Sequence, residues 1–181
     1  MILTNMTKNI LSVKEIEHKD INFIADYWFN SDKEYLLNMG VDTEKLPARE
    51  DFVTMLQTQI TLPYNEKKVY GVVWYVDNKP IGHSNLNPLV YNDHGYMHLH
   101  IWYQEYRNKG YGIDFIKMST AAYFNNLKLK KLYCQPNAFN PSPNKTLEKA
   151  GFKFVKEYIT TPGSITFEQA VKLWEVNEAI I

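Results

Sequence analysis

The sequence contains a single cysteine, Cys134, and its 20 basic and 20 acidic side chains cancel. One cysteine excludes an internal disulfide and a cysteine-rich metal site, so we expect no metal and a reducing, cytoplasmic setting. A formal net charge of zero argues against non-specific nucleic-acid binding, which depends on clustered cations. We therefore expect neither a metal nor a nucleic acid among the partners of this chain.

Long apolar runs are also missing. The longest strongly apolar stretch, Tyr70 to Val76, is far shorter than the roughly 20 residues that a membrane-spanning helix needs. Met1 to Asn9 is polar and lacks the apolar segment of a signal peptide. No repeat or flexible linker divides the 181 residues, and a content of 45% apolar residues is enough for a sizeable core. We expect a single domain over residues 1–181 and no association with a membrane.

Hydrophobic periodicity predicts a chain that mixes strands and helices. Strands are expected at 10–13, 69–76, 81–86, 97–103, 131–135, 152–160 and 166–176, with a polar loop at 87–95. Helices are expected from 21 behind a cap at Asp20, at 35–39, from 47 to 59, from 110 to 126, and up to 150 behind a cap at Ser142. This order is typical of an α+β domain in which the strands between 69 and 103 run antiparallel.

The segment from Arg107 to Gly112, of sequence RNKGYG, lies where an expected strand meets an expected helix. The first N–H groups of a helix have no partners within the helix, and the helix dipole adds positive potential there. Gly110 and Gly112 would let an anion approach the backbone, and Arg107 and Lys109 would add charge. The pattern predicts an anion site, although an ordinary glycine-containing loop would give the same residues. It fits neither a phosphate-binding P-loop nor a dinucleotide fingerprint.

A second informative stretch runs from Gln135 to Phe152. Asn140 is followed by Leu147-Glu148-Lys149-Ala150-Gly151-Phe152. One expected helix and one expected strand separate this stretch from the RNKGYG turn. In this order, the turn and the Asn140–Phe152 stretch resemble the two acyl-CoA signatures of the GNAT superfamily of N-acetyltransferases. Shorter matches resemble the aminoglycoside 6'-N-acetyltransferase, the siderophore-biosynthetic and the ribosomal-protein N-acetyltransferase branches of that superfamily.

The resemblance implies a fold and a cofactor. The fold is a mixed, mostly antiparallel sheet of about seven strands with helices on both faces. The co-substrate is acetyl-CoA, with the pantetheine between the strand ending at Tyr103 and the strand beginning at Lys131, and the pyrophosphate on the RNKGYG turn. Asn140 would bond the pantetheine arm or fix its loop. The implied cofactor-binding residues are Ile101, Trp102, Tyr103, Arg107, Asn108, Lys109, Gly110, Tyr111, Gly112, Asn140 and Lys145.

The implied reaction is attack of a primary amine on the thioester, which needs a base to take the amine proton. His98 and His100 lie on one side of a regular strand, and histidine titrates near neutral pH. We expect His98 to be the base, although a structural histidine or a role for Glu105 is left open. His83, Asn85 and His100 are expected to bind the acceptor.

One position departs from the family pattern. Many members carry a tyrosine seven residues after the motif asparagine, as acid for the departing thiolate, and here that position is Leu147. Tyr158, Tyr103 or water could replace it, or no acid is needed. The departure also leaves open a catalytically silent acyl-CoA-binding module on the same fold.

The acceptor is not specified by the sequence. A small-molecule amine and the amino terminus of a peptide both fit, as do a monomer and a homodimer. An acidic pocket would favour a polycationic substrate such as an aminoglycoside. The residues considered for such a pocket are Glu44, Glu50, Asp51 and Asp93.

Overall fold

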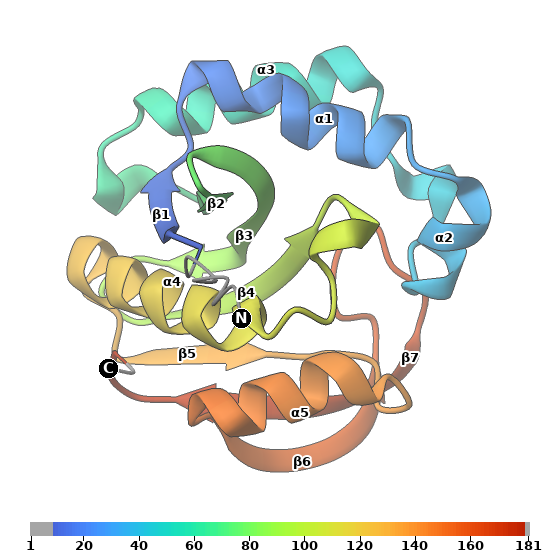
Figure 1. Cartoon of the computed structure of the whole chain (residues 1–181), viewed down its shortest axis with the longest axis vertical. Helices are drawn as coiled ribbons and strands as arrows, with labels where there is room; N and C mark the ends of the chain where they lie inside the picture. The colour runs from blue at the N-terminus through green and yellow to red at the C-terminus, as the bar shows by residue number, and fades with distance from the viewer. Residues whose placement is uncertain (1–8, 180–181) are drawn as a thin grey trace, which may run out of the picture.

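The computed structural model describes residues 9–179, so the polar stretch at the N-terminus lies outside the described residues except for Asn9. Within this range, seven strands form one sheet in the order β1-β2-β3-β4-β5-β7-β6. Each neighbouring pair is antiparallel except β4 and β5, which run parallel (Figure 1). The strands are β1 (Leu11–Glu15), β2 (Tyr70–Val76), β3 (Lys79–Val90), β4 (His94–Ile101), β5 (Lys131–Cys134), β6 (Lys153–Thr160) and β7 (Gln169–Val176).

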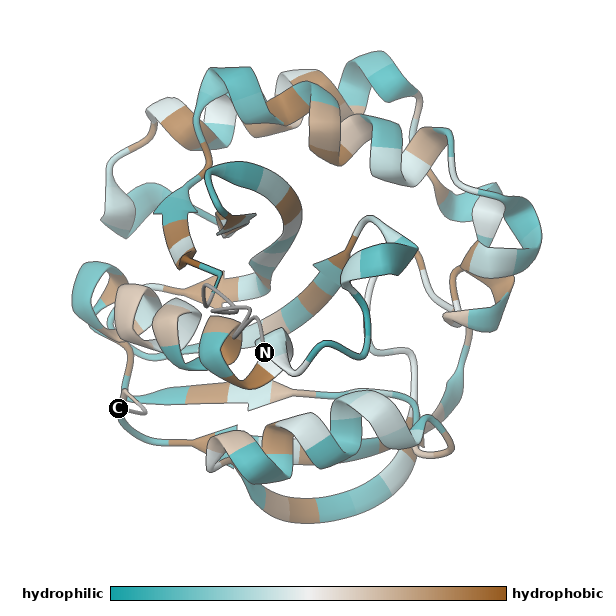
Figure 2. Cartoon of the chain, viewed as in Figure 1, coloured by the Kyte–Doolittle hydropathy of each residue, from teal (hydrophilic) through white to brown (hydrophobic). Residues whose placement is uncertain are grey.

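Helices cover both faces of the sheet, so the predicted α+β fold is confirmed. Figure 1 shows α1, α2 and α3 as an arc on one side of the molecule, with α4 and α5 together on another. The helices are α1 (Ile21–Phe29), α2 (Lys33–Asn38), α3 (Arg49–Thr61), α4 (Tyr111–Leu127) and α5 (Pro141–Ala150). Figure 2 shows polar and apolar residues alternating along α1 and α3, as expected for helices with one buried side. No helix in residues 9–179 is long and apolar enough to cross a membrane.

Helix α4 is fixed to the sheet by aromatic residues. The rings of Trp74 and Phe115 stack with centroids 4.9 Å apart. The indole Nε1–H of Trp74 donates to Ser119 Oγ at 2.9 Å, and the hydroxyl of Tyr123 donates to Ser84 Oγ at 2.7 Å. Because these side chains come from β2, β3 and α4, they determine where the first turn of α4 lies relative to β4.

The β3–β4 hairpin is longer than the sequence predicts. The expected polar loop at 87–95 is wrong for most of its length, because β3 continues to Val90 and β4 begins at His94. A register shift between Leu86 and Leu89 turns Leu89 inward, where it is 4% exposed. The sequence of this stretch does not predict a strand, because the irregularity breaks the alternation of apolar and polar positions.

Two predicted helix caps are also wrong. Asp20 occupies the N-cap position of α1, but its carboxylate accepts from the Glu17 N–H and from the Tyr75 hydroxyl instead. Helix α5 begins at Pro141, and the side chain of Asn140 caps it by accepting from the N–H of Ser142 at 3.3 Å. The final strand, predicted for 166–176, is confirmed from Gln169.

The Trp74–Ser119 hydrogen bond gives a test of how α4 is held. Ser119→Ala leaves the buried Nε1–H of Trp74 without this acceptor, which costs about 1–3 kcal/mol. We expect the free energy of unfolding, measured by urea titration, to fall by that amount. Ser142→Ala, at an exposed position of α5, is the control and should change it by less than about 0.5 kcal/mol. Equal effects of the two substitutions would contradict this account of α4.

Candidate active site

The parallel pair β4–β5 comes apart in the middle of the sheet. Its last paired residues are Met97 and Cys134, although β4 continues to Ile101. Beyond Met97 the edge of β4 that faced β5 has no neighbouring strand, and the chain after Cys134 turns away through Gln135 and Pro136. The predicted separation of these two strands is therefore present in the structure.

The pairing of β4 with β3 decides which of its backbone groups face this gap. Ile81 and Trp102 lie opposite one another, and the Trp102 N–H donates to the Ile81 carbonyl at 2.9 Å. In an antiparallel ladder hydrogen-bonded and non-hydrogen-bonded pairs alternate, so the N–H groups of Leu99 and Ile101 point away from β3. This agrees with the position expected for Ile101 and adds Leu99, which sequence reasoning missed.

Trp102 does not fit its expected role in cofactor binding. Its N–H is occupied by Ile81, and its indole Nε1–H donates to His83 Nδ1 at 2.8 Å. The indole also stacks on Phe23 of α1 with centroids 6.0 Å apart. The backbone N–H of Trp102 thus serves the pairing with the β3 side, and its indole packs on the side of the sheet that α1 covers.

The RNKGYG turn leads into α4 in a strained conformation. Gly110 is the N-cap with φ of 83°, and Asn108 also has positive φ, 57°. No side-chain hydrogen bond among the described residues caps α4, and a Cβ added at Gly110 would meet no atom of residues 9–179 within 4 Å. The first amides of α4 therefore face open space, with the exposed Lys109 beside them.

Gly112, Tyr111 and Arg107 of the turn make contacts with other parts of the protein. A Cβ at Gly112 would lie 3.2 Å from Thr146 Cγ2, so this glycine lets α4 and α5 pack closely. The Tyr111 hydroxyl accepts from Asn9 Nδ2 at 2.8 Å. The Arg107 guanidinium turns back and donates to the Ile101 carbonyl at 2.9 Å, and it lies 4.7 Å from the centre of the Tyr35 ring.

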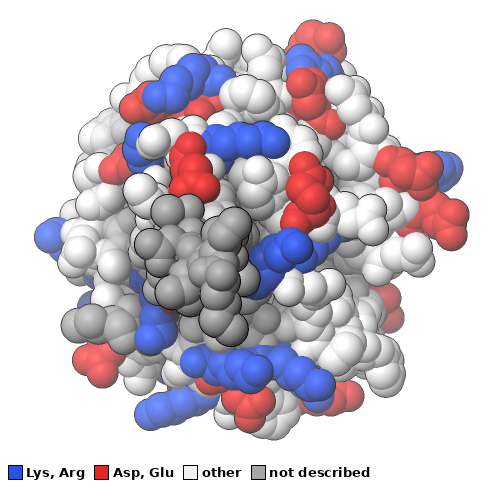
Figure 3. All heavy atoms as spheres, viewed as in Figure 1, with Lys and Arg blue, Asp and Glu red and all other residues white. Residues whose placement is uncertain are grey.

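Three further residues predicted to bind the cofactor, Tyr103, Asn140 and Lys145, lie in different surroundings. Tyr103 has Lys79 Nζ 5.1 Å from its ring centre. Asn140 caps α5 and also lines the cavity described below. Lys145 is exposed on α5 and lines a separate pocket with Phe139 and Trp174. Figure 3 shows a row of cationic side chains across the region that α5 occupies in Figure 1.

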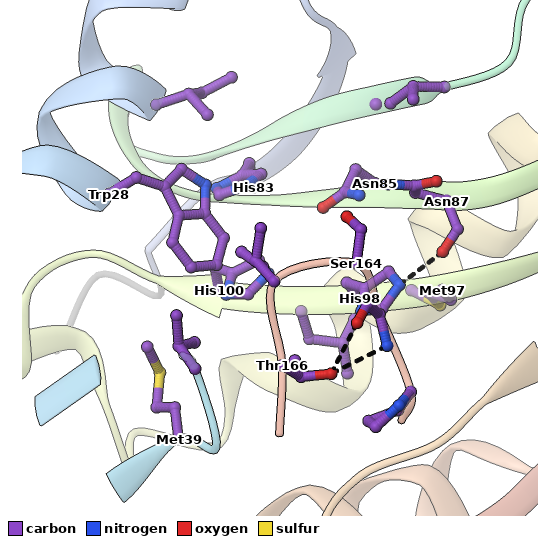
Figure 4. Close-up of a pocket in the computed structure, with 18 of the residues that line it drawn as sticks. Trp28, Met39, His83, Asn85, Asn87, Met97, His98, His100, Ser164 and Thr166 are labelled. Carbon is purple, nitrogen blue, oxygen red and sulfur yellow. Dashed lines mark hydrogen bonds between the residues drawn. The ribbon is translucent and has the colours of Figure 1, made fainter. Parts of the chain in front are cut away.

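A cavity of about 570 Å³ lies next to the gap, between the sheet and α1–α3. Met97, Leu99, Cys134 and Gln135 line it, so the cavity reaches the point where β4 and β5 separate. Figure 4 shows Trp28 entering it from α1, and Ser164 and Thr166 from the loop before β7. All four residues proposed for the acceptor side also line it: His83, Asn85, His98 and His100.

His98 has the properties of a proton acceptor. Its Nε2 lies 2.8 Å from the carbonyl oxygen of Asn87, which cannot donate, so Nε2 carries the proton and Nδ1 holds a lone pair. Burial lowers the pKa of His98 below its ordinary value, and the bond to Asn87 opposes this shift. His98 is therefore neutral at pH 7, and the same bond stabilises the imidazolium once a proton arrives.

His83 and His100 form a stacked pair below the cavity. Their ring centroids are 4.7 Å apart, and His83 is only 2% exposed. His83 Nδ1 accepts from Trp102, so its remaining proton is on Nε2. Burial, reinforced by the charge that His98 would carry, lowers the pKa of His83 to about 3. Burial also holds the pKa of His100 well below its ordinary value, with His83 and His98 adding to the shift.

A chain of contacts joins His100 to the RNKGYG turn. His100 Nδ1 lies 3.3 Å from the Tyr27 hydroxyl, which lies 3.3 Å from the Tyr35 hydroxyl. The guanidinium of Arg107 donates to that Tyr35 hydroxyl at 2.6 Å. Sequence reasoning missed Tyr27 and Tyr35, whose spacing predicts only a buried helix face.

Other candidates lie away from the cavity. Leu147 is fully buried, and neither Tyr103 nor Tyr158 lines the cavity. Glu105 is exposed and does not line it either. None of the four residues considered for an acidic pocket is among the residues that line the cavity: Glu44, Glu50, Asp51 and Asp93.

The lowered histidine pKa values make stability depend on pH. His83 binds a proton in the unfolded chain near pH 6.5 but in the folded protein only near pH 3, so unfolding takes up protons between these values. Stability is therefore full above about pH 6.5 and falls as the pH is lowered, by about 2 kcal/mol from His83 at pH 5. Urea unfolding at pH 7 and pH 5 measures this loss.

His83→Asn removes the titrating group while an amide oxygen can still accept from Trp102. We expect the loss of unfolding free energy between pH 7 and pH 5 to be smaller in this variant by the His83 contribution of about 2 kcal/mol. This expectation does not depend on the stability of the variant at pH 7. His18→Asn, at an exposed histidine, is the control. An unchanged difference between pH 7 and pH 5 in His83→Asn would refute the assignment of His83 as a buried neutral group.

Comparison with known proteins gives a family. Residues 11–153 match the family model described as the acetyltransferase (GNAT) domain. A search of curated proteins gave no match. Solved structures share the architecture. A RimL ribosomal L7/L12 alpha-N-protein acetyltransferase in complex with coenzyme A is 10% identical, covers 94% of this chain and 96% of its own, and has a TM-score of 0.73.

A spermidine N-acetyltransferase from Vibrio cholerae, in complex with CoA and spermine, is 19% identical, with 94% and 96% of the two chains covered and a TM-score of 0.74. An uncharacterized protein from Bacillus halodurans is 16% identical, with 95% and 86% covered and a TM-score of 0.67. At these identities the structures establish the fold, and the family model establishes the family. The chain therefore belongs to the GNAT acetyltransferase family, which confirms the predicted family, fold and enzyme class.

Proposed function

We propose that this protein is an acetyl-CoA-dependent N-acetyltransferase that acetylates a primary amine by direct attack on the thioester. One observation carries the proposal. The gap between β4 and β5 opens onto the cavity that contains His98, so a thioester in the gap and an amine in the cavity would meet beside a neutral histidine. The structural neighbours solved with CoA support the choice of donor.

The residues around the gap fit an acyl-CoA. Open space above Gly110 and the uncapped amides of α4 suit a pyrophosphate, with Lys109 at its side. Arg107 is engaged by Ile101 and Tyr35, so the backbone rather than this side chain would supply most of the contacts. The free edge of β4 offers amides to the pantetheine, as another strand would.

Acetyl-CoA supplies the acetyl group as a thioester. The N–H of Leu99 or Ile101, which points into the gap, would donate to the carbonyl oxygen as negative charge develops on it. Such preorganised donors contribute about 3–4 kcal/mol each in a well-studied protease. Because the strand is fixed by β3 on its other edge, these donors need no reorganisation during the reaction.

His98 would remove the proton that the amine nitrogen loses on forming the new C–N bond. The proton goes to Nδ1, and Asn87 stabilises the resulting imidazolium through Nε2–H. The C–S bond breaks as the amide forms, and the sulfur leaves with the bonding pair. A thiolate whose parent thiol has a pKa of about 8.5 is a tolerable leaving group, so the step does not need the tyrosine absent at Leu147.

A catalytically silent acyl-CoA-binding module is the second candidate. It is favoured by the buried Leu147 and by the absence of Tyr103 and Tyr158 from the cavity lining. Incubation with acetyl-CoA and a panel of amines, with free thiol measured, separates the two. Amine-dependent thiol release supports the enzyme, whereas binding of CoA without release on any amine supports the silent module.

The proposed base is tested with His98→Gln. Loss of general-base catalysis costs about 10²–10⁴-fold in rate, so we expect kcat/KM to fall by about that factor while the Kd of acetyl-CoA stays within about threefold. The limb of the pH profile below pH 6.5, where His98 becomes protonated, should disappear. The control is His94→Gln on the same strand, whose ring contacts Asp93 and does not line the cavity. A kcat/KM within threefold of the original enzyme would exclude His98 as the base.

The proposed pyrophosphate site is tested with Gly110→Asn. Asparagine tolerates positive φ better than other side chains, and a Cβ at this position meets no atom of the described residues within 4 Å, so the fold should persist. The side chain occupies the space above the α4 amides, and we expect the Kd of CoA to rise about tenfold or more, or about 1.4 kcal/mol. Calorimetric titration measures it. Gly151→Asn, at another glycine with positive φ, 105°, should leave the Kd unchanged. Unchanged affinity in Gly110→Asn would overturn the assignment of this turn.

A further inference from the structure

We propose that the acceptor is a primary amine carried on an apolar body without a second positive charge, and not a polyamine. This inference rests on the proposed function, since it concerns the acceptor half of the same site. It is drawn from the cavity between the sheet and α1–α3, whose lining differs from what a polycation requires.

The helix side of the cavity is mostly apolar, with Asn38 and Gln59 as its polar helix residues. It is formed by Trp28 of α1, Met39 after α2, Phe52, Met55 and Leu56 of α3, and Ile165 of the loop before β7. Trp28 lies edge-on to the His100 ring with centroids 4.9 Å apart, so an aromatic edge stands directly beside the floor of the cavity (Figure 4). Such a wall favours an aliphatic or aromatic group, since burial of apolar surface drives its binding.

The charges around the cavity oppose a polycation. Its lining contains one carboxylate, Glu15, and two ammonium groups, Lys45 and Lys67. Oε1 of Glu15 already accepts from the Tyr64 hydroxyl at 2.6 Å and from Asn126 Nδ2 at 2.8 Å. A polyamine or aminoglycoside would therefore bring several cations to a cavity whose described lining offers one carboxylate, already hydrogen-bonded through Oε1, and two ammonium groups of its own.

The polar residues on the sheet side of the cavity do not supply the negative charge that a polycation would need. His83, His98 and His100 are neutral, and the amides of Asn85 and Asn87 carry no net charge. A second ammonium group buried here would lose its hydration without gaining an ion pair. For the reacting amine the same environment is useful, because desolvation lowers its pKa and produces the neutral nucleophile near His98.

Both lysines are held by groups of the protein. Lys45 Nζ donates to the Thr166 carbonyl at 3.0 Å and lies 3.5 Å from Asp42. Lys67 Nζ donates to the carbonyls of Gln59 and Ile60, near the end of α3. The positive charges of Lys45 and Lys67 repel cations in the cavity. Because groups of the protein already bind both ammonium groups, a carboxylate on the substrate would have to compete with them. The body attached to the amine is therefore expected to be uncharged.

Two sources supply such an amine: a free arylalkylamine, or a peptide whose first residue has an apolar side chain. The test is thiol release from acetyl-CoA with phenethylamine, tryptamine, a Met-Leu peptide amide, spermidine and kanamycin as acceptors. We expect kcat/KM for one of the first three to exceed that for spermidine and kanamycin by about 100-fold, the scale of burying an unpaired charge. The ratio between the arylalkylamines and the peptide identifies the source. A preference for spermidine or kanamycin would overturn the inference.

Met55→Glu tests the same point from the protein side. It places a carboxylate in the apolar wall, and we expect the preference between phenethylamine and spermidine to shift toward spermidine by about tenfold or more. Thr54→Glu, the neighbouring exposed residue outside the cavity lining, adds the same charge to α3 and should leave the preference unchanged. If both variants shift it equally, the cavity is not the acceptor site and the inference fails.

Failure of the inference and failure of the proposed function give different results. If no amine releases thiol although acetyl-CoA binds, the proposed function fails. Calorimetric titration of the CoA-loaded protein with phenethylamine and spermidine then decides the inference alone. Binding of phenethylamine to the original protein, weakened in Met55→Glu and not in Thr54→Glu, supports it. Binding of spermidine only, or of neither amine, overturns it.

Discussion

The separation of β4 from β5 is the constraint on which the site depends. Each strand has a second neighbour, β3 for β4 and β7 for β5, so the two can part without losing their places in the sheet. Backbone groups freed in this way must find other partners. The carbonyl of Met97 accepts from the Cys134 thiol, and that of Ile101 accepts from Arg107. The amides of Leu99 and Ile101 point away from β3 into the gap, where we propose that an extended molecule binds.

Sequence reasoning predicts those parts of the candidate site that depend on local chemistry. The alternation in 97–103 and the glycines of the RNKGYG turn require no knowledge of the rest of the chain. The different tasks of Gly110 and Gly112 could not be predicted, because they depend on where Thr146 of α5 lies. The same is true of Arg107, whose charge suggested a phosphate contact and whose partners, Ile101 and Tyr35, are a strand end and a distant helix.

The surroundings of the histidines also could not be predicted from the sequence. Alternation places His98 and His100 on one side of β4, but the register with β3 gives them different neighbours: Asn85 lies opposite His98, and His83 opposite His100. His100 is then enclosed by His83, Tyr27 and Trp28, while His98 bonds Asn87 and keeps one nitrogen unprotonated. The sequence predicts strands at 152–160 and 166–176 and assigns no function to the chain between them, yet residues 162–166 line the cavity, since no periodic pattern marks a loop that folds back over a sheet.

The two halves of the site are built on shared residues. Arg107 bonds the end of β4 and, through Tyr35 and Tyr27, reaches the floor of the cavity at His100. Helix α2, which carries Tyr35, is thereby fixed by the turn that precedes α4. A polar network inside a protein that satisfies its members rigidifies its surroundings. Donor and acceptor would then meet in a preformed geometry, and an apolar cavity that removes water from the amine would perform part of the activation before His98 takes its proton.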